Sequence, residues 1–179
     1  MPLSEKETIL FGIPVPSDDK IFLAIVVFHI LLGIICVSSG VTAMLSEKGS
    51  VVHRRSGKIY YRALLLVFIS VIPLSIMRWP HNNDLLVLGT LSFFTAYSGR
   101  QLALKRRSGW TRLHTMLMGS SYILLLTAFY VDNGKNLPFW NQFSQLFFWL
   151  FPSAIGVPII IYVLLRHPLN RMRSEKTDS

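Results

Sequence analysis

The chain has 179 residues, of which 51% are hydrophobic and only 15% are charged. A soluble domain has about a quarter of its residues charged, whereas this chain repeats apolar runs of about 20 residues, enough to cross a bilayer. These features exclude an ordinary soluble domain and predict an integral membrane protein. The net charge of +9 does not indicate a nucleic-acid partner, because Lys and Arg flank the apolar runs. The single cysteine, Cys36, excludes an internal disulfide.

The apolar runs predict an all-α, polytopic bundle of five transmembrane helices. Residues 1–19, interrupted by Pro14 and Pro16, are expected to form a segment outside the membrane. The spans are expected at about 20–45, 59–77, 85–104, 113–131 and 143–165, followed by a polar cytoplasmic tail at 166–179. We do not interpret the first span as a cleaved signal peptide, because no basic segment precedes it and it is too long.

Two of the predicted spans carry small residues along one helical face. The first has His29, Gly33, Cys36 and Gly40, and the third has Gly89, Ser92, Ala96 and Gly99. Small residues let membrane helices approach closely, so both faces are expected to pack against neighbouring helices.

Basic residues predict the orientation. Most of the 18 Lys and Arg residues follow the first and third spans or lie in the tail. The positive-inside rule therefore places the amino terminus outside and the carboxyl terminus in the cytoplasm, which agrees with five spans.

The motif Arg-Arg-Ser-Gly occurs twice, at residues 54–57 and 106–109. Aligning the copies places Arg62 opposite His114. Two interpretations stay open, namely a duplicated helical hairpin and two basic turns that obey the same topological rule.

The acidic residues all lie in predicted loops, tails or span ends. A buried carboxylate would be expected in an ion-coupled transporter or an intramembrane hydrolase, because it persists in the membrane only for a task. No serine triad, paired carboxylates or phosphate-binding loop is evident. The pattern favours a protein that is not an enzyme.

Three histidines are the candidate cofactor ligands. His29, in the first span, is expected to bind a haem, a metal or a lipid-like ligand, or to make an interhelical hydrogen bond to a Ser or Thr such as Ser92 or Thr95. His53 and His114 lie at similar depth, as a bis-imidazole b-type haem requires, or are simply interfacial. His29 lies 16 residues from Leu45, about 24 Å of helix, so it should not share an iron with His53.

Three arginines are the candidate headgroup ligands. Arg54, Arg55 and Arg112 are expected to bind an anionic lipid headgroup or a haem propionate. Zinc would require further ligands, so a metal site stays open.

The chain resembles an uncharacterised bacterial family of multi-pass membrane proteins, domain of unknown function 2306. The resemblance covers about residues 25–130 and rests on Lys48-Gly49, His53-Arg54, Gly57-Lys58-Ile59-Tyr60 and Ser98-Gly99-Arg100, together with the small-residue face of the first span. It implies a helical bundle in the bacterial plasma membrane, without an established activity or cofactor.

The predicted function is that of a small bundle that binds a lipid or another hydrophobic ligand, or supports a membrane-protein complex. The expected partners are the bilayer, anionic headgroups at the cytoplasmic face, and a partner protein or second copy. The alternative is a redox protein that binds haem b through histidines. A metal-dependent membrane enzyme is a third interpretation, although no carboxylate is placed as a base.

Overall fold

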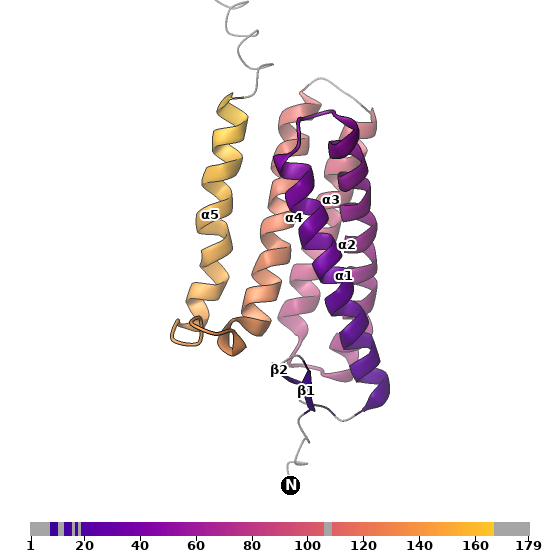
Figure 1. The fold of residues 1–179 in the computed structure, drawn as a ribbon, viewed down its shortest axis with the longest axis vertical. Coiled ribbons are helices and arrows are strands. Elements are labelled where there is room, and N and C mark those ends of the chain that lie inside the picture. The colour runs from indigo at the N-terminus through magenta and orange to yellow at the C-terminus, as the bar shows by residue number, and fades with distance from the viewer. Residues whose placement is uncertain (1–7, 11–12, 16, 18, 106–108, 167–179) are drawn as a thin grey trace, which may run out of the picture.

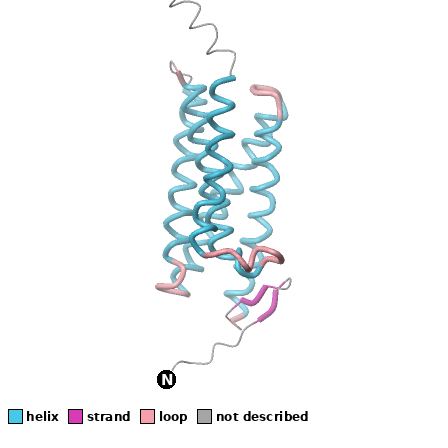
Figure 2. The backbone as a smooth tube through the Cα atoms, turned by 90° about the vertical axis from the view of Figure 1, so that its left-hand side faces the viewer, coloured by secondary structure: helices cyan, strands magenta, loops and turns pink. Residues whose placement is uncertain are grey.

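A computed structural model describes residues 8–10, 13–15, 17, 19–105 and 109–166. Five long helices run side by side and alternate in direction (Figures 1 and 2). Their bounds are α1 Lys20–Leu45, α2 Val51–Met77, α3 Asn83–Lys105, α4 Trp110–Asn133 and α5 Gln145–Arg166, with a short 3-10 helix, η1, at Gly134–Asn136. The predicted tail, apart from Arg166, lies outside the described residues.

A small β-hairpin precedes α1, at a place where no strand was expected. Strand β1, Thr8–Leu10, pairs antiparallel with β2, Ile13–Val15, and Thr8 lies opposite Val15. The hairpin lies beyond the end of the bundle where α1 begins (Figure 2). Residues 8–10 and 13–15 thus form the two strands of the described chain, and its other regular elements are helices.

Helix α2 begins eight residues before the predicted span, which corrects the expected loop around His53. Ser50 caps the helix, because its hydroxyl accepts a hydrogen bond from the backbone N–H of His53 at 3.1 Å. Serine is a favoured cap because it satisfies one of the free N–H groups of the first turn. The basic stretch is thus the first turns of a helix.

Four helices, α1 to α4, enclose the main core. Buried Cys36, Tyr60, Ala63, Leu64 and Ala96 form its centre, with Met118, Tyr122 and Leu125 packed against it. Helix α5 packs mainly against α4, along one edge of the bundle (Figure 1). Helix α5 is therefore an addition to a four-helix unit.

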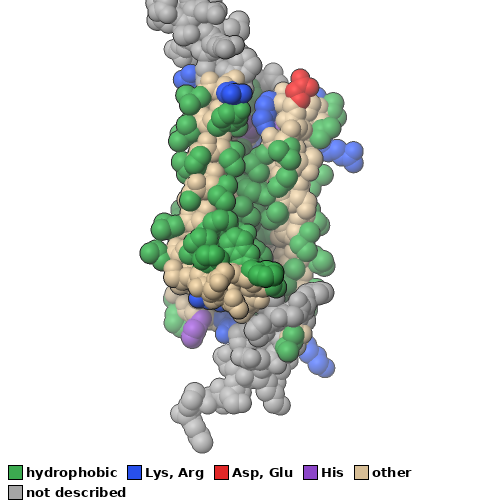
Figure 3. All heavy atoms as spheres, turned by 60° about the vertical axis from the view of Figure 1, so that its left-hand side comes forward, with side chains coloured by type: hydrophobic (Ala, Val, Ile, Leu, Met, Phe, Trp, Pro, Cys, Tyr) green, Lys and Arg blue, Asp and Glu red, His purple; other side chains and the backbone are tan. Residues whose placement is uncertain are grey.

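Among the residues that the structure describes, four helices are long and apolar enough to cross a membrane: α1, α2, α4 with its 3-10 extension, and α5. Hydrophobic side chains cover most of the length of the visible face, and Lys and Arg lie near its two ends (Figure 3). Helix α3 has 23 residues but is not among the four, since Thr90, Ser92, Thr95, Ser98 and Arg100 lower its apolar content.

Candidate functional site at the basic end of the bundle

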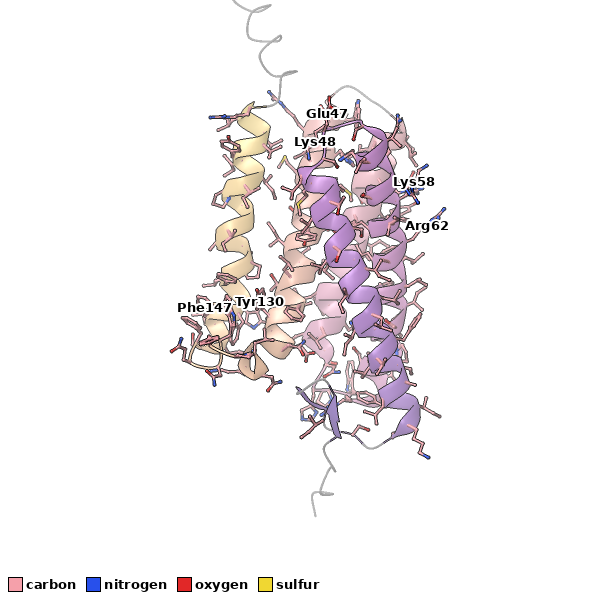
Figure 4. All side chains as sticks on the ribbon, viewed as in Figure 1. Glu47, Lys48, Lys58, Arg62, Tyr130 and Phe147 are labelled. Carbon is pink, nitrogen blue, oxygen red and sulfur yellow. The ribbon has the colours of Figure 1, made fainter. Side chains whose placement is uncertain are left out.

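The basic end, as we call it, is the end where α1 and α3 terminate and α2 and α4 begin. The structure places there Lys48, Arg54, Arg55, Lys58, Arg62, Arg100, Lys105 and Arg112. Glu47 lies in the same turn as Lys48, at the top of the bundle in Figure 4. Arg106, Arg107 and Ser108, which belong to the second copy of the repeated motif, lie outside the described residues.

His53 joins α2 to the end of α1. Its Nδ1 lies 2.8 Å from the carbonyl oxygen of Ala43. That carbonyl belongs to the last turn of α1, where no backbone N–H of the helix can reach it. The bond therefore caps α1 as well as orienting the imidazole.

His114 makes the matching bond between α4 and α3. Its Nδ1 lies 2.9 Å from the carbonyl oxygen of Gly99. The helices approach closely here, because a Cβ at Gly99 would lie 3.1 Å from Leu117 Cβ and 3.2 Å from Met118 Sδ. Gly99 is six residues before the end of α3, where the helix already supplies an N–H donor to its carbonyl. Unlike the bond of His53, this bond is not needed as a helix cap.

The two hairpins, α1–α2 and α3–α4, therefore carry equivalent histidines. The equivalence extends to the small residues, which have the same spacing in both: Gly33, Cys36, Gly40 and Ala43 in α1, and Gly89, Ser92, Ala96 and Gly99 in α3. In each hairpin the last of the four offers its carbonyl to the histidine. The structure thus makes His114 the equivalent of His53. Alignment of the two Arg-Arg-Ser-Gly copies had instead placed His114 opposite Arg62.

The two imidazoles lie at the same end of the bundle, near the starts of α2 and α4, and Lys48 lies in the turn just before α2. The ammonium group of Lys48 also donates to the carbonyls of Met44 and Ala43, at 3.5 Å from the latter. Burial lowers the pKa of Lys48 from its usual value. His53, His114 and Lys48 make up the candidate site, and we call His53 and His114 the histidine pair.

The hydrogen bonds define the chemistry of the pair. A carbonyl oxygen can only accept a hydrogen bond, so Nδ1 of His53 and Nδ1 of His114 must each carry the proton. In the neutral rings Nε2 then carries the lone pair. An Nδ1–H bond to a backbone carbonyl is the arrangement that commonly orients a metal-ligating imidazole.

His29 lies elsewhere. It is ten residues into α1, and its Nδ1 lies 2.8 Å from Ser70 Oγ on α2. The alternative of an interhelical bond to a Ser or Thr is confirmed, but the partner is Ser70 and not Ser92 or Thr95. Ser92 donates to the Ser121 carbonyl, and Thr95 donates to Leu91 of its own helix. Ser70 donates to the carbonyl of Val67, so its oxygen is left to accept from His29. His29 is an interhelical contact far from the histidine pair.

Arg54, Arg55 and Arg112 are exposed in the first turns of α2 and α4. The structure therefore places His53 and His114 at the same end of the bundle and leaves the three arginines on the surface there.

A buried hydroxyl network, which the sequence did not predict, lies two helical turns below the pair. Tyr60 Oη on α2 lies 2.8 Å from Ser121 Oγ on α4, and Ser92 Oγ on α3 donates to the Ser121 carbonyl at 2.8 Å. Tyr122 Oη donates to the carbonyl of Val37 on α1 at 3.2 Å. The network links all four helices and fixes the spacing of α2 and α4 below the histidines.

Within the described ranges, no group of three or more His, Cys, Asp or Glu side chains could hold a metal ion. Two imidazoles alone do not complete the four-ligand shell of structural zinc, whereas a b-type haem would need no protein ligands beyond two histidines.

The comparisons identify a family without an assigned activity. A family described as predicted membrane protein, domain of unknown function 2306, matches residues 26–162. Neither a curated protein nor a solved structure matches the chain.

Proposed function

Since the chain belongs to the family of predicted membrane proteins called domain of unknown function 2306, we propose that it is a multi-pass membrane protein that holds a b-type haem between His53 and His114. The observation that carries the proposal is the shared hydrogen-bond arrangement: each Nδ1–H is bonded to a backbone carbonyl, so each Nε2 keeps its lone pair. Haem needs only these two protein ligands.

When bound, the haem would supply one-electron redox chemistry. The residues of this chain would hold and orient it. The Ala43 and Gly99 carbonyls fix the two ring planes, and these bonds raise the basicity of the ligating nitrogens. Lys48, which lies beside the pair, would pair with a haem propionate, and exposed Arg54, Arg55 and Arg112 are further candidates for that contact.

An absorption spectrum tests the proposal. Protein purified from haem-replete cells should show a Soret band, which His53→Ala and His114→Ala should each abolish or shift. His81→Ala, in the turn between α2 and α3 at the opposite end, is the matched control and should leave the band unchanged. His29→Ala should also leave it unchanged. A wild-type protein without a Soret band overturns the proposal.

The second candidate is a bundle that binds a lipid or another hydrophobic ligand, or supports a complex with a partner protein or second copy. It is favoured by the exposed cations of α2, which continue directly into exposed apolar side chains. Native mass spectrometry after mild extraction tests it. A protein that retains neither lipid nor partner would remove this candidate.

We also propose that α3 completes five spans, with the amino terminus outside and the basic end in the cytoplasm of a bacterial cell. The cations of the basic end support the orientation through the positive-inside rule. The hydroxyls of α3 are compatible with a membrane span. Thr90 donates to the Leu86 carbonyl and Thr95 to the Leu91 carbonyl, so neither hydroxyl would be left unbonded in lipid.

A further inference from the structure

We propose that the outward face of α2 binds one anionic phospholipid, with its phosphate at Arg62 and Lys58 and an acyl chain along Leu66 and Ile69. The proposal names a specific site for the lipid-binding candidate above and does not depend on haem.

The site is one continuous face of α2. Lys58, Arg62, Leu66 and Ile69 are four, four and three residues apart, so they follow one another along one side of the helix. All four are exposed, and Figure 4 shows Lys58 and Arg62 pointing away from the bundle. The face is cationic toward the basic end and apolar below it, which is the order of phosphate and acyl chain in a phospholipid.

The depth of Arg62 distinguishes this face from ordinary basic turns. Cys36 Sγ contacts the Tyr60 carbonyl at 3.7 Å, so these two residues lie at the same level of antiparallel α1 and α2. Arg62 is two residues beyond Tyr60, and Ile34 is two residues before Cys36. Arg62 therefore lies level with Ile34, whose side chain is 58% exposed.

The neighbouring helix has no charged side chain from that level to its end, and its exposed Ser38 and Thr42 donate their hydroxyls to carbonyls of the same helix. Val41, Met44 and Leu45 of α1 are also exposed, and they lie nearer the basic end than Ile34 does. If these side chains face lipid tails, Arg62 lies at the depth of the tails or of their boundary with the headgroups. A guanidinium there is costly unless it reaches an anion.

The described part of the bundle provides no acidic side chain at this level. Helix α2 has no Asp or Glu, and α3 has only Asp84, at its opposite end. Arg100 of α3 adds a further cation, since its guanidinium lies 4.6 Å from the ring centre of Tyr61, the residue next to Arg62. A lipid phosphate would therefore supply the missing negative charge at Arg62 and Lys58.

Native mass spectrometry of the purified full chain in mild detergent tests the site, with added phosphatidylglycerol and phosphatidylcholine as probes. We expect wild type to bind one phosphatidylglycerol in preference to phosphatidylcholine. Arg62→Gln should weaken that binding about fivefold to tenfold, and Arg62→Lys should restore most of it.

The matched control is Lys105→Gln, which removes an exposed cation of the basic end that lies on α3 and not on this face of α2, and it should change binding by less than about twofold. Equal retention of phosphatidylglycerol by the Arg62→Gln and Lys105→Gln variants would overturn the site while leaving general lipid binding intact. A wild-type protein that binds neither lipid would overturn both the site and the lipid-binding candidate. The Soret band of the Arg62→Gln variant should match wild type, which separates this test from the haem proposal.

Discussion

Tyr60 shows how single polar groups hold this bundle together. Its side chain is 2% exposed, and its hydroxyl is bonded to Ser121 at 2.8 Å. A buried hydroxyl without a partner costs more than the bond itself contributes, so removing Tyr60 Oη leaves Ser121 poorly satisfied. We expect Tyr60→Phe to lower the free energy of unfolding by about 0.6–2 kcal/mol.

Thermal unfolding in mild detergent measures this change. Tyr162→Phe is the control, because Tyr162 is exposed on α5, and its ring remains available to Arg166 after the substitution. The melting temperature of Tyr60→Phe should fall clearly below that of the control. Indistinguishable melting temperatures would contradict a structural role for the network.

The sequence singled out the histidines of the site, but it did not predict the groups to which they are hydrogen-bonded. The sequence predicted similar depths for His53 and His114, because both lie near the basic ends of the second and fourth predicted spans. The carbonyls of Ala43 and Gly99 were not predictable, since every residue has a carbonyl and only the helix packing selects one. The same holds for Ser70, which is separated from His29 by 41 residues.

At the scale of elements, the small-residue face of α1 was predicted, but its positions differ in how closely they pack. A Cβ at Gly40 would lie 2.5 Å from Cε2 of Tyr122, whereas a Cβ at Gly33 would meet no atom within 4 Å. Tyr122 cannot move freely, because its hydroxyl is bonded to Val37. Helical spacing predicted the small-residue face of α1. The close contact at Gly40 depends on where Tyr122 lies, which the spacing could not predict.

We therefore expect Gly40→Ala to destabilise the protein by about 1–3 kcal/mol through overpacking. Gly33→Ala, in the same helix, is the matched control and should change the free energy of unfolding by less than about 0.5 kcal/mol. Chemical unfolding followed by circular dichroism measures both. Similar effects of the two substitutions would show that helix propensity, rather than the Tyr122 contact, decides stability.

Helix α5 is held to α4 by isoleucines that pack over glycines. A Cβ at Gly119 would lie 2.6 Å from Ile160, and one at Gly156 would lie 2.4 Å from Ile123. We expect the double variant Gly119→Leu, Gly156→Leu to separate α5 from α4 without unfolding the four-helix unit. Hydrogen exchange should then rise in residues 145–166 and stay unchanged in 51–77, while Gly33→Leu leaves both unchanged. Equal increases in both segments would mean that α5 is part of one cooperative unit.

The start of α2 shows where hydropathy fails to define an element. The apolar run predicted a span from residue 59, but the helix begins at Val51 because Ser50 caps it and His53 anchors it to α1. Arg54, Arg55 and Lys58 do not interrupt a helix, since long cationic side chains can extend away from it into water or toward headgroups. Hydropathy therefore reported the apolar part of α2 and missed its first two turns.

At the scale of the whole molecule, the position of α3 decides the topology. The hairpins α1–α2 and α3–α4 are equivalent in small-residue spacing and in their histidine bonds, so α3 is expected to cross the membrane as α1 does. His81 and Lys105 lie at opposite ends of α3, and both are exposed. If α3 spans, they lie on opposite sides of the bilayer.

Labelling with a membrane-impermeant maleimide tests this arrangement. In a Cys36→Ala background, which removes the single native thiol, His81→Cys should be labelled in intact cells. Lys105→Cys should be labelled only after permeabilisation, because the positive-inside rule places the basic end in the cytoplasm. Labelling of both from outside, or of neither, would mean that α3 does not span. The reverse pattern would keep five spans and invert the orientation, which would also place the histidine pair and Arg62 at the outer face.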